Sequence, residues 1–161
     1  MIDEALVVES GISAGDPWLT VEAGAIRDAL TGLKHDGYRL MCFMTCVDHL
    51  ADSSKEWPAR FELVYQLRNL ESREEIRVRT FVDGETPRID SVHDIFPPAN
   101  WDEREVYDMF GVVFNDHPDL SRILMPDDWV GHPLRRDYPV GGDPVEFSAE
   151  HETWQTAPEK A

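Results

Sequence analysis

The sequence has few basic residues and no long apolar run, and each shortage excludes a class of protein. Its 161 residues include 15 Lys and Arg against 32 Asp and Glu, which gives a net charge of −17. Such a surface repels phosphate backbones and anionic lipids, so nucleic acid is not an expected partner. The longest uncharged run, Leu40 to Val47, is far shorter than the ~20 apolar residues of a membrane-spanning helix. No transmembrane segment is therefore expected.

Cysteine is also scarce. The two cysteines, Cys42 and Cys46, lie in the same apolar run, which is predicted to be a buried strand. A strand would hold them roughly 13 Å apart, too far for a disulfide. Two thiolates are half of what an ordinary iron–sulfur cluster needs, so the chain is not expected to hold a cluster alone. We interpret both as buried structural thiols of a reducing compartment.

Motifs for metals, nucleotides and nucleophiles are missing. The six histidines form no His-x-x-x-His pair, and the sequence contains no phosphate loop, dinucleotide fingerprint or nucleophile elbow. The first four residues, Met-Ile-Asp-Glu, lack the basic start of a signal or transit peptide. We expect no metal, no NAD and no nucleotide in this chain, and we expect it to remain in the compartment where it is made.

What is present is enough apolar sequence for one domain, since 42% of the residues are hydrophobic. Periodicity predicts an α+β fold, with a mixed, largely antiparallel sheet, helices packed on it, and an extended Pro-rich C-terminal tail. The predicted division is an acidic N-terminal segment (1–19), an α+β domain (20–111) and a tail (112–161).

The predicted helices and strands have recognisable signals. Thr20 is a candidate N-cap for a helix with Ile26, Ala29, Leu30 and Leu33 on one face, ending near Asp36 and Gly37. Asn100 is a candidate N-cap for a helix over 101–110, with Gly111 at its C-terminal end. The expected strands are a buried one at 40–47, a half-buried one at 61–67, an alternating one at 75–82 after a hairpin turn at 69–74, and a short one at 87–92.

The tail contains eight of the eleven prolines within the last 65 residues, so regular structure should not persist there. It nevertheless keeps apolar residues such as Phe114, Leu124, Trp129 and Leu134, too many for a solvated segment. The tail therefore requires a surface to cover. Either it folds over its own domain or it lies across another protein.

The predicted helix 101–110 carries the densest cluster of charges. One interpretation is a solvated face on which Arg104 and Asp108 pair at i, i+4. A second is an acid–base enzyme that uses Glu103, Glu105 and Asp108.

A basic spot follows in the tail. Arg135 and Arg136 could bind carboxylates of another surface, or pair internally with Glu103 or Asp108.

The sequence resembles the C subunit of the proton-pumping NADH:quinone oxidoreductase, the thirty-kilodalton subunit family of respiratory complex I. The resemblance covers roughly residues 20–140, and Arg136 stands where that family usually has lysine. It rests on the runs 45–48, 61–67, Asn100 to Gly111, Phe114, His117-Pro118, Arg122 to Pro126, Trp129, and Gly131 to Pro139.

The resemblance implies a cofactor-free scaffold subunit of the hydrophilic arm, at the cytoplasmic face of the bacterial inner membrane. FMN, iron–sulfur clusters and quinone would then belong to partner subunits, and the chain would pack against the D subunit, which helps form the quinone pocket beside the B subunit. The equivalent subunit of a hydrogenase- or ferredoxin-linked complex is the alternative. The resemblance assigns interface roles to Glu103, Arg104, Glu105, Asp108, His117, Arg122, Arg135, Arg136 and Asp137.

Overall fold

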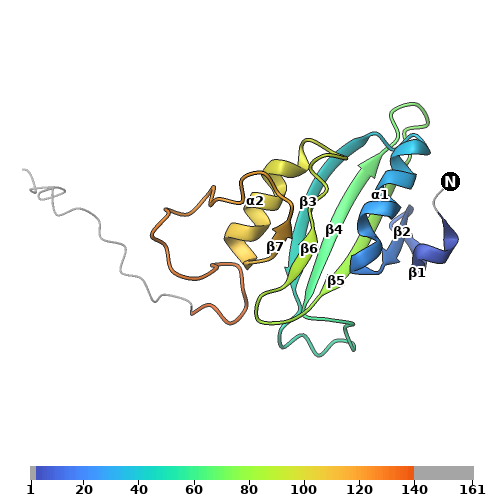
Figure 1. Ribbon diagram of the computed structural model, residues 1–161. Coiled ribbons are helices and arrows are strands. Elements are labelled where there is room, and N and C mark those ends of the chain that lie inside the picture. The colour runs from blue at the N-terminus through green and yellow to red at the C-terminus, as the bar shows by residue number, and fades with distance from the viewer. Residues whose placement is uncertain (1–2, 140–161) are drawn as a thin grey trace, which may run out of the picture.

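The alternating strands of the sequence build a five-stranded sheet in the computed structural model, which describes residues 3–139 (Figure 1). The sheet order is β1-β2-β5-β4-β3, in which β2 and β5 run parallel and the other neighbours are antiparallel. The strands are β1 (Val7–Ser13), β2 (Asp16–Val21), β3 (Leu40–Asp48), β4 (Phe61–Arg68) and β5 (Glu75–Val82). The predicted α+β class is confirmed.

Two helices and a small parallel pair of strands lie against one face of this sheet (Figure 1). The helices are α1 (Ile26–His35) and α2 (Ala99–Phe110), and the paired strands are β6 (Arg88–Asp90) and β7 (Val113–Asn115). Short 3-10 turns, η1 (Glu4–Leu6) and η2 (Ala23–Ala25), precede β1 and α1. The apolar side chains of this face form one core with those of both helices.

The core follows the predicted periodicities. The apolar stripe of α1, namely Ile26, Ala29, Leu30 and Leu33, is fully buried as predicted. Strands β4 and β5 form the predicted antiparallel hairpin across 69–74. Helix α2 ends at Gly111, whose φ of +74° places it in the left-handed region that favours glycine.

Both predicted helix N-caps are wrong. Thr20 lies in β2, and α1 begins after the 3-10 turn η2 with Ala25 at its N-cap. Helix α2 begins at Ala99, with Pro98 at its N-cap, so Asn100 lies inside the helix. In both places the preceding chain is held by the sheet or by prolines, and tertiary context outweighs the preference of the capping residue.

The interpretation of the two middle strands also requires correction. The sequence pattern predicts a half-buried β4, yet Glu62 and Gln66 on its second face are buried too. They are covered because β4 lies between β3 and β5 and contacts their long side chains, including Arg77 and Arg79.

Strand β3 is an edge strand, with an irregularity between Met41 and Phe43 that leaves Cys42 exposed. Only Cys46 is buried, so the prediction of two buried thiols is half right.

Residues 7–21 form a hairpin that the sequence pattern did not reveal. Strands β1 and β2 extend the sheet beyond β5, and the proposed boundary after residue 19 falls within β2. Few apolar residues of β1 are buried, so its periodicity is weak.

Candidate functional site

The predicted interface residues fall into buried and exposed groups around α2. Glu103 and Asp108 have no exposed surface and face the inside of the chain. Glu105, Arg136 and Asp137 are exposed. The remaining four, Arg104, His117, Arg122 and Arg135, are partly buried.

Asp108 is the anchor of the segment 118–139, which we call the strap. Its Oδ2 accepts three consecutive backbone N–H groups, from Ile123 (3.1 Å), Leu124 (2.8 Å) and Met125 (2.8 Å). Its Oδ1 lies 2.5 Å from a guanidinium nitrogen of Arg122. Burial alone would raise the pKa of Asp108, but these four donors outweigh it and hold the pKa below its ordinary value. The carboxylate is therefore charged and fully engaged.

Arg122 fixes the next part of the strap as well. It donates to the carbonyl oxygens of Trp129 and Gly131, both at 3.0 Å. The expected pair of Arg104 with Asp108 is wrong, because Arg104 donates instead to the carbonyls of Ser121 (3.1 Å) and Arg122 (3.0 Å). Both arginines thus hold the strap backbone along α2.

The strap also satisfies the carbonyl groups at the C-terminal end of α2, which have no partners within the helix. His132 Nδ1 lies 2.9 Å from the Asp108 carbonyl, and the Leu134 N–H donates to Met109 at 3.1 Å. Arg135 donates to the carbonyl of Phe110 and lies over the Phe61 ring. The alternative in which Arg135 pairs internally with Glu103 or Asp108 is therefore not what the fold shows.

A second buried carboxylate, Asp48 at the end of β3, fastens the end of the strap. Both its oxygens accept from Arg60, at 2.9 and 2.7 Å, and Oδ2 also accepts the Arg136 N–H at 2.9 Å. Arg60 continues to Asp137 at 2.9 Å. Burial opposes ionisation, but Arg60 and the backbone donors lower the pKa of Asp48 to about 2.

Sequence analysis assigned no role to Asp48 or Arg60. The available signal was Asp48 itself, a carboxylate at the end of an apolar run that requires a partner if buried.

Arg60 should matter far more to stability than an exposed arginine. Arg60→Gln leaves the buried Asp48 without its charged partner, and we expect a loss of about 2–3 kcal/mol in the free energy of unfolding, measured with urea. The control is Arg68→Gln, because Arg68 forms a 3.7 Å pair with Glu75 on the surface. That variant should lose under about 1 kcal/mol. Equal losses in the two variants would contradict an anchoring role for Arg60.

Glu103 lies deeper than a surface contact would. Its Oε1 accepts the Val92 N–H at 2.7 Å, and its Oε2 lies 2.5 Å from the Ser91 hydroxyl oxygen. His117, whose side chain is also fully buried, lies 3.9 Å away through Nε2. These contacts join α2 to the loops after β6 and β7.

The outer surface of α2 and the strap carries exposed apolar side chains. Trp101 and Leu124 are each 60% exposed, Leu134 is 53% exposed and Val130 is 85% exposed. The strap projects beyond the sheet beside α2 (Figure 1). Its backbone is thus held from inside, while these side chains face solvent.

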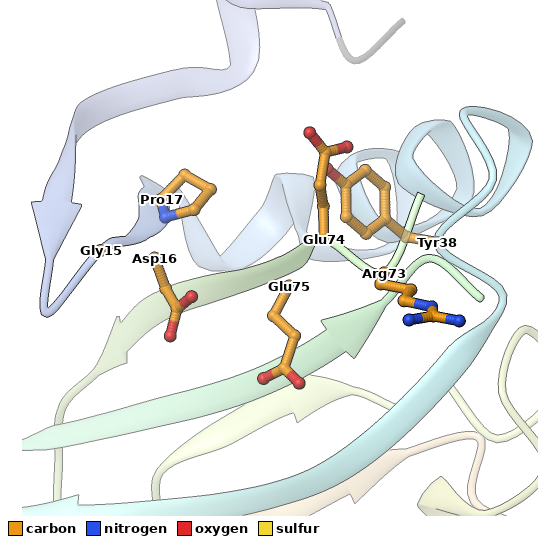
Figure 2. A pocket seen from close by; sticks show the side chains of 7 residues that line it. All are labelled: Gly15, Asp16, Pro17, Tyr38, Arg73, Glu74 and Glu75. Atoms are coloured by element: carbon orange, nitrogen blue, oxygen red, sulfur yellow. The ribbon is translucent and has the colours of Figure 1, made fainter. Parts of the chain in front are cut away.

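A separate hollow of about 400 Å³ lies at the other end of the molecule. Figure 2 shows it between the β1–β2 turn and the β4–β5 turn, with Tyr38 beside Glu74. Burial, with help from Glu74, raises the pKa of Tyr38. Its lining, Gly15, Asp16, Pro17, Tyr38, Arg73, Glu74 and Glu75, includes none of the predicted interface residues.

Within residues 3–139 no three His, Cys, Asp or Glu side chains are placed to hold a metal ion together. Over the same residues, neither helix is long and apolar enough to cross a membrane.

Comparison with known proteins identifies the family. Residues 19–144 match the family described as the respiratory-chain NADH dehydrogenase 30 kDa subunit. The chain belongs to this family. The 30 kDa subunit family includes the NADH-quinone oxidoreductase C subunit of Geobacter metallireducens, which is 46% identical over 129 residues, 80% of this chain and 77% of the relative.

Other relatives are longer. The C subunit of Salinispora arenicola is 42% identical over 139 residues, 84% of this chain and 55% of the relative. That of Salinispora tropica is 47% identical over 110 residues, and the match spans 68% of this chain and 43% of the relative. The chain thus spans about half the length of these two relatives.

Solved structures of the 30 kDa subunit family and related complexes share the fold. A chain described as Nqo5 of the trypsin-resistant fragment (1-134) has a TM-score of 0.65 and 31% identity, covering 70% of this chain and 89% of that one. A chain of the membrane-bound sulfane sulfur reductase, an archaeal respiratory membrane complex, has a TM-score of 0.70 and 31% identity. That match covers 82% of this chain and 77% of the other.

Proposed function

We propose that the chain is a cofactor-free scaffold subunit in the hydrophilic arm of an NADH:quinone oxidoreductase. Such a subunit supports electron transfer from NADH to quinone, coupled to proton translocation, without binding FMN, an iron–sulfur cluster or quinone itself. It would lie at the cytoplasmic face of the bacterial inner membrane and pack against the D subunit, close to the B subunit. Membership of the 30 kDa subunit family supports the assignment.

The observation that carries the scaffold role is the exposed apolar surface on an anchored strap. Leu124, Val130 and Leu134 remain exposed although the strap backbone around them is held by Asp108 and Arg122. Exposed apolar side chains on an ordered backbone suit a protein–protein interface, because a partner can bury them without first ordering the segment.

The nine predicted residues would then contribute in two ways. Glu105, Arg136 and Asp137 are exposed and could meet the D subunit directly. The others, Glu103, Arg104, Asp108, His117, Arg122 and Arg135, would act by holding α2 and the strap in position.

The geometry does not favour the acid–base enzyme. Both oxygens of Asp108 are occupied by donors of the strap, and a carboxylate with a lowered pKa in this setting has no proton to deliver. A related complex with another electron donor has better support, since the sulfane sulfur reductase chain shares the fold.

The test is incorporation of surface variants into the complex in native membranes. Val130→Asp should reduce co-purification of the D subunit and NADH:quinone activity by roughly 10-fold, as expected for a charge at the centre of an apolar contact. Ile12→Asp is the matched control, because Ile12 is 77% exposed on β1, away from the strap. Its assembly should be unchanged.

Equal behaviour of the two variants would overturn the interface. A co-purified complex that oxidises another donor but not NADH would favour the alternative.

A further inference from the structure

A line of hydrogen bonds connects the buried Glu103 carboxyl to a partly exposed imidazole. Glu103 Oε2 lies 2.5 Å from Ser91 Oγ, and Ser91 Oγ lies 2.9 Å from Nδ1 of His93. Glu103 and Ser91 are buried, whereas His93 is partly exposed. The hydroxyl group can donate to one neighbour while it accepts from the other, so it can connect two groups that exchange protons.

The other imidazole near Glu103 is already committed. His117 Nε2 lies 3.1 Å from the carbonyl of Asn100, and its Nδ1 accepts the Asp119 N–H at 3.1 Å. A ring nitrogen that accepts cannot also carry a proton, so His117 is neutral with its proton on Nε2. Burial lowers the pKa of His117 in the same direction. Protonation of His117 would therefore break a backbone hydrogen bond, whereas His93 has no such constraint at Nδ1.

Charged and titratable groups from the surrounding elements set the proton affinity of Glu103. Burial raises its pKa to about 7, although Ser91 and the Val92 N–H favour the ionised form. Arg27 of α1 also favours ionisation, but it is engaged by Asp94 at 2.6 Å, and Asp94 opposes it.

Tyr65 of β4 faces the same region. It is fully buried, and burial together with Glu103 raises its pKa. Tyr65 is therefore neutral and leaves the charge of Glu103 uncompensated from the sheet side.

We propose that Glu103, Ser91 and His93 form a proton-binding site, in which solvent protons reach the buried carboxyl through the Ser91 hydroxyl and the His93 ring. The site is a property of this chain and does not depend on the proposed partner.

Loading the site moves two protons in sequence. In the empty state the Ser91 O–H donates to the Glu103 carboxylate, and Ser91 Oγ accepts from His93 Nδ1–H. The hydroxyl proton passes to Oε2, and the Nδ1 proton replaces it on Ser91. An imidazolium thereby becomes neutral with its remaining proton on Nε2, and the carboxylate becomes a carboxylic acid. The partly exposed ring then takes a new proton from water.

Loading changes the link between α2 and the loop after β6. A charged Glu103 holds the Val92 N–H and Ser91 as an ionised acceptor, whereas a neutral one removes a buried charge. Because the folded pKa of about 7 exceeds the ordinary value of 4.5, the folded state binds the proton more tightly than the unfolded state does. Its contribution to stability is complete below pH 4.5 and is lost as the pH rises to about 7.

The test is an NMR titration of the full chain, with carbon-13 in the glutamate carboxyl groups and nitrogen-15 in the histidine rings. Glu103 should titrate near pH 7, and the His93 Nδ1 signal should change in the same transition. In Ser91→Ala the carboxylate loses a donor, so the Glu103 midpoint should rise and the His93 signal should no longer follow it. Ser72→Ala is the matched control, since Ser72 lies in the exposed β4–β5 turn, and it should leave both titrations unchanged.

A second readout uses Glu103→Gln. Between pH 4.5 and 7 the folding equilibrium constant of the wild-type chain should fall on the order of 100-fold relative to this variant. A Glu103 carboxyl that stays ionised from about pH 5 to 9 would overturn the proposal. So would a His93 signal that follows Glu103 equally in Ser91→Ala and in the wild type.

Discussion

Asp108→Ala is expected to lower the free energy of unfolding by about 3–5 kcal/mol, the usual cost of removing one partner of a buried ion pair. The substitution leaves Arg122 without its carboxylate and leaves three backbone N–H groups, at Ile123, Leu124 and Met125, without an acceptor. Asp108→Asn keeps the size and one acceptor oxygen, so its loss should be intermediate. Urea unfolding measures both variants.

The control for this prediction is Glu105→Gln on the exposed side of the same helix. It should change stability by less than about 0.5 kcal/mol. A loss at Asp108→Ala no larger than that of Glu105→Gln would mean that the strap does not depend on the buried carboxylate.

Gly111→Ala is expected to release the strap from the end of α2. A Cβ at this position would lie 2.5 Å from a guanidinium nitrogen of Arg135 and 2.5 Å from Nε2 of His132. Its φ of +74° adds about 1–2 kcal/mol of backbone strain for a residue with a side chain. Together the two effects should cost about 2–5 kcal/mol, because displaced strap side chains lose their bonds to α2.

Gly84→Ala separates the two effects. Gly84 also has a positive φ, of +105°, but no atom lies within 4 Å of its added Cβ. It should lose only the strain energy and leave the strap in place, as hydrogen exchange of residues 122–135 would show. Equal losses and equal exchange in both variants would mean that the contact between Gly111 and the strap contributes nothing.

The sequence predicted those parts of the fold that depend on local periodicity. The stripe of α1 and the alternation of β5 are each set by one segment and one buried face, so their spacing was sufficient. Strand β1 was missed because most of it is exposed, and an exposed strand has no reason to alternate.

The site was harder to predict because its bonds are not local. Arg104 lies one helical turn before Asp108, and local geometry favours that pair. The fold instead brings Arg122 and three backbone N–H groups onto the carboxylate from the strap. Four donors stabilise a buried charge better than one side chain on a helix surface, so the tertiary arrangement wins. No spacing in the sequence records where the strap returns to α2.

The strap itself answers one of the two alternatives for the tail. Its inner side covers the chain's own helix, through Asp108, Arg122 and the end of α2, while Val130 and Leu134 remain exposed. Covering its own domain and presenting a surface to a partner are therefore compatible. We retain partner packing as the proposal for the outer side of the strap.

The central claim is that the strap is held by the chain itself and buries its outer side against a partner subunit. Hydrogen exchange of the strap, in the isolated chain and in the complex purified from native membranes, tests it most directly. The N–H groups of residues 123–125 should already be protected in the isolated chain, and residues 129–134 should gain protection only in the complex. The claim would be contradicted if residues 123–125 exchanged in the isolated chain as fast as an unstructured peptide, or if residues 129–134 exchanged equally fast in both.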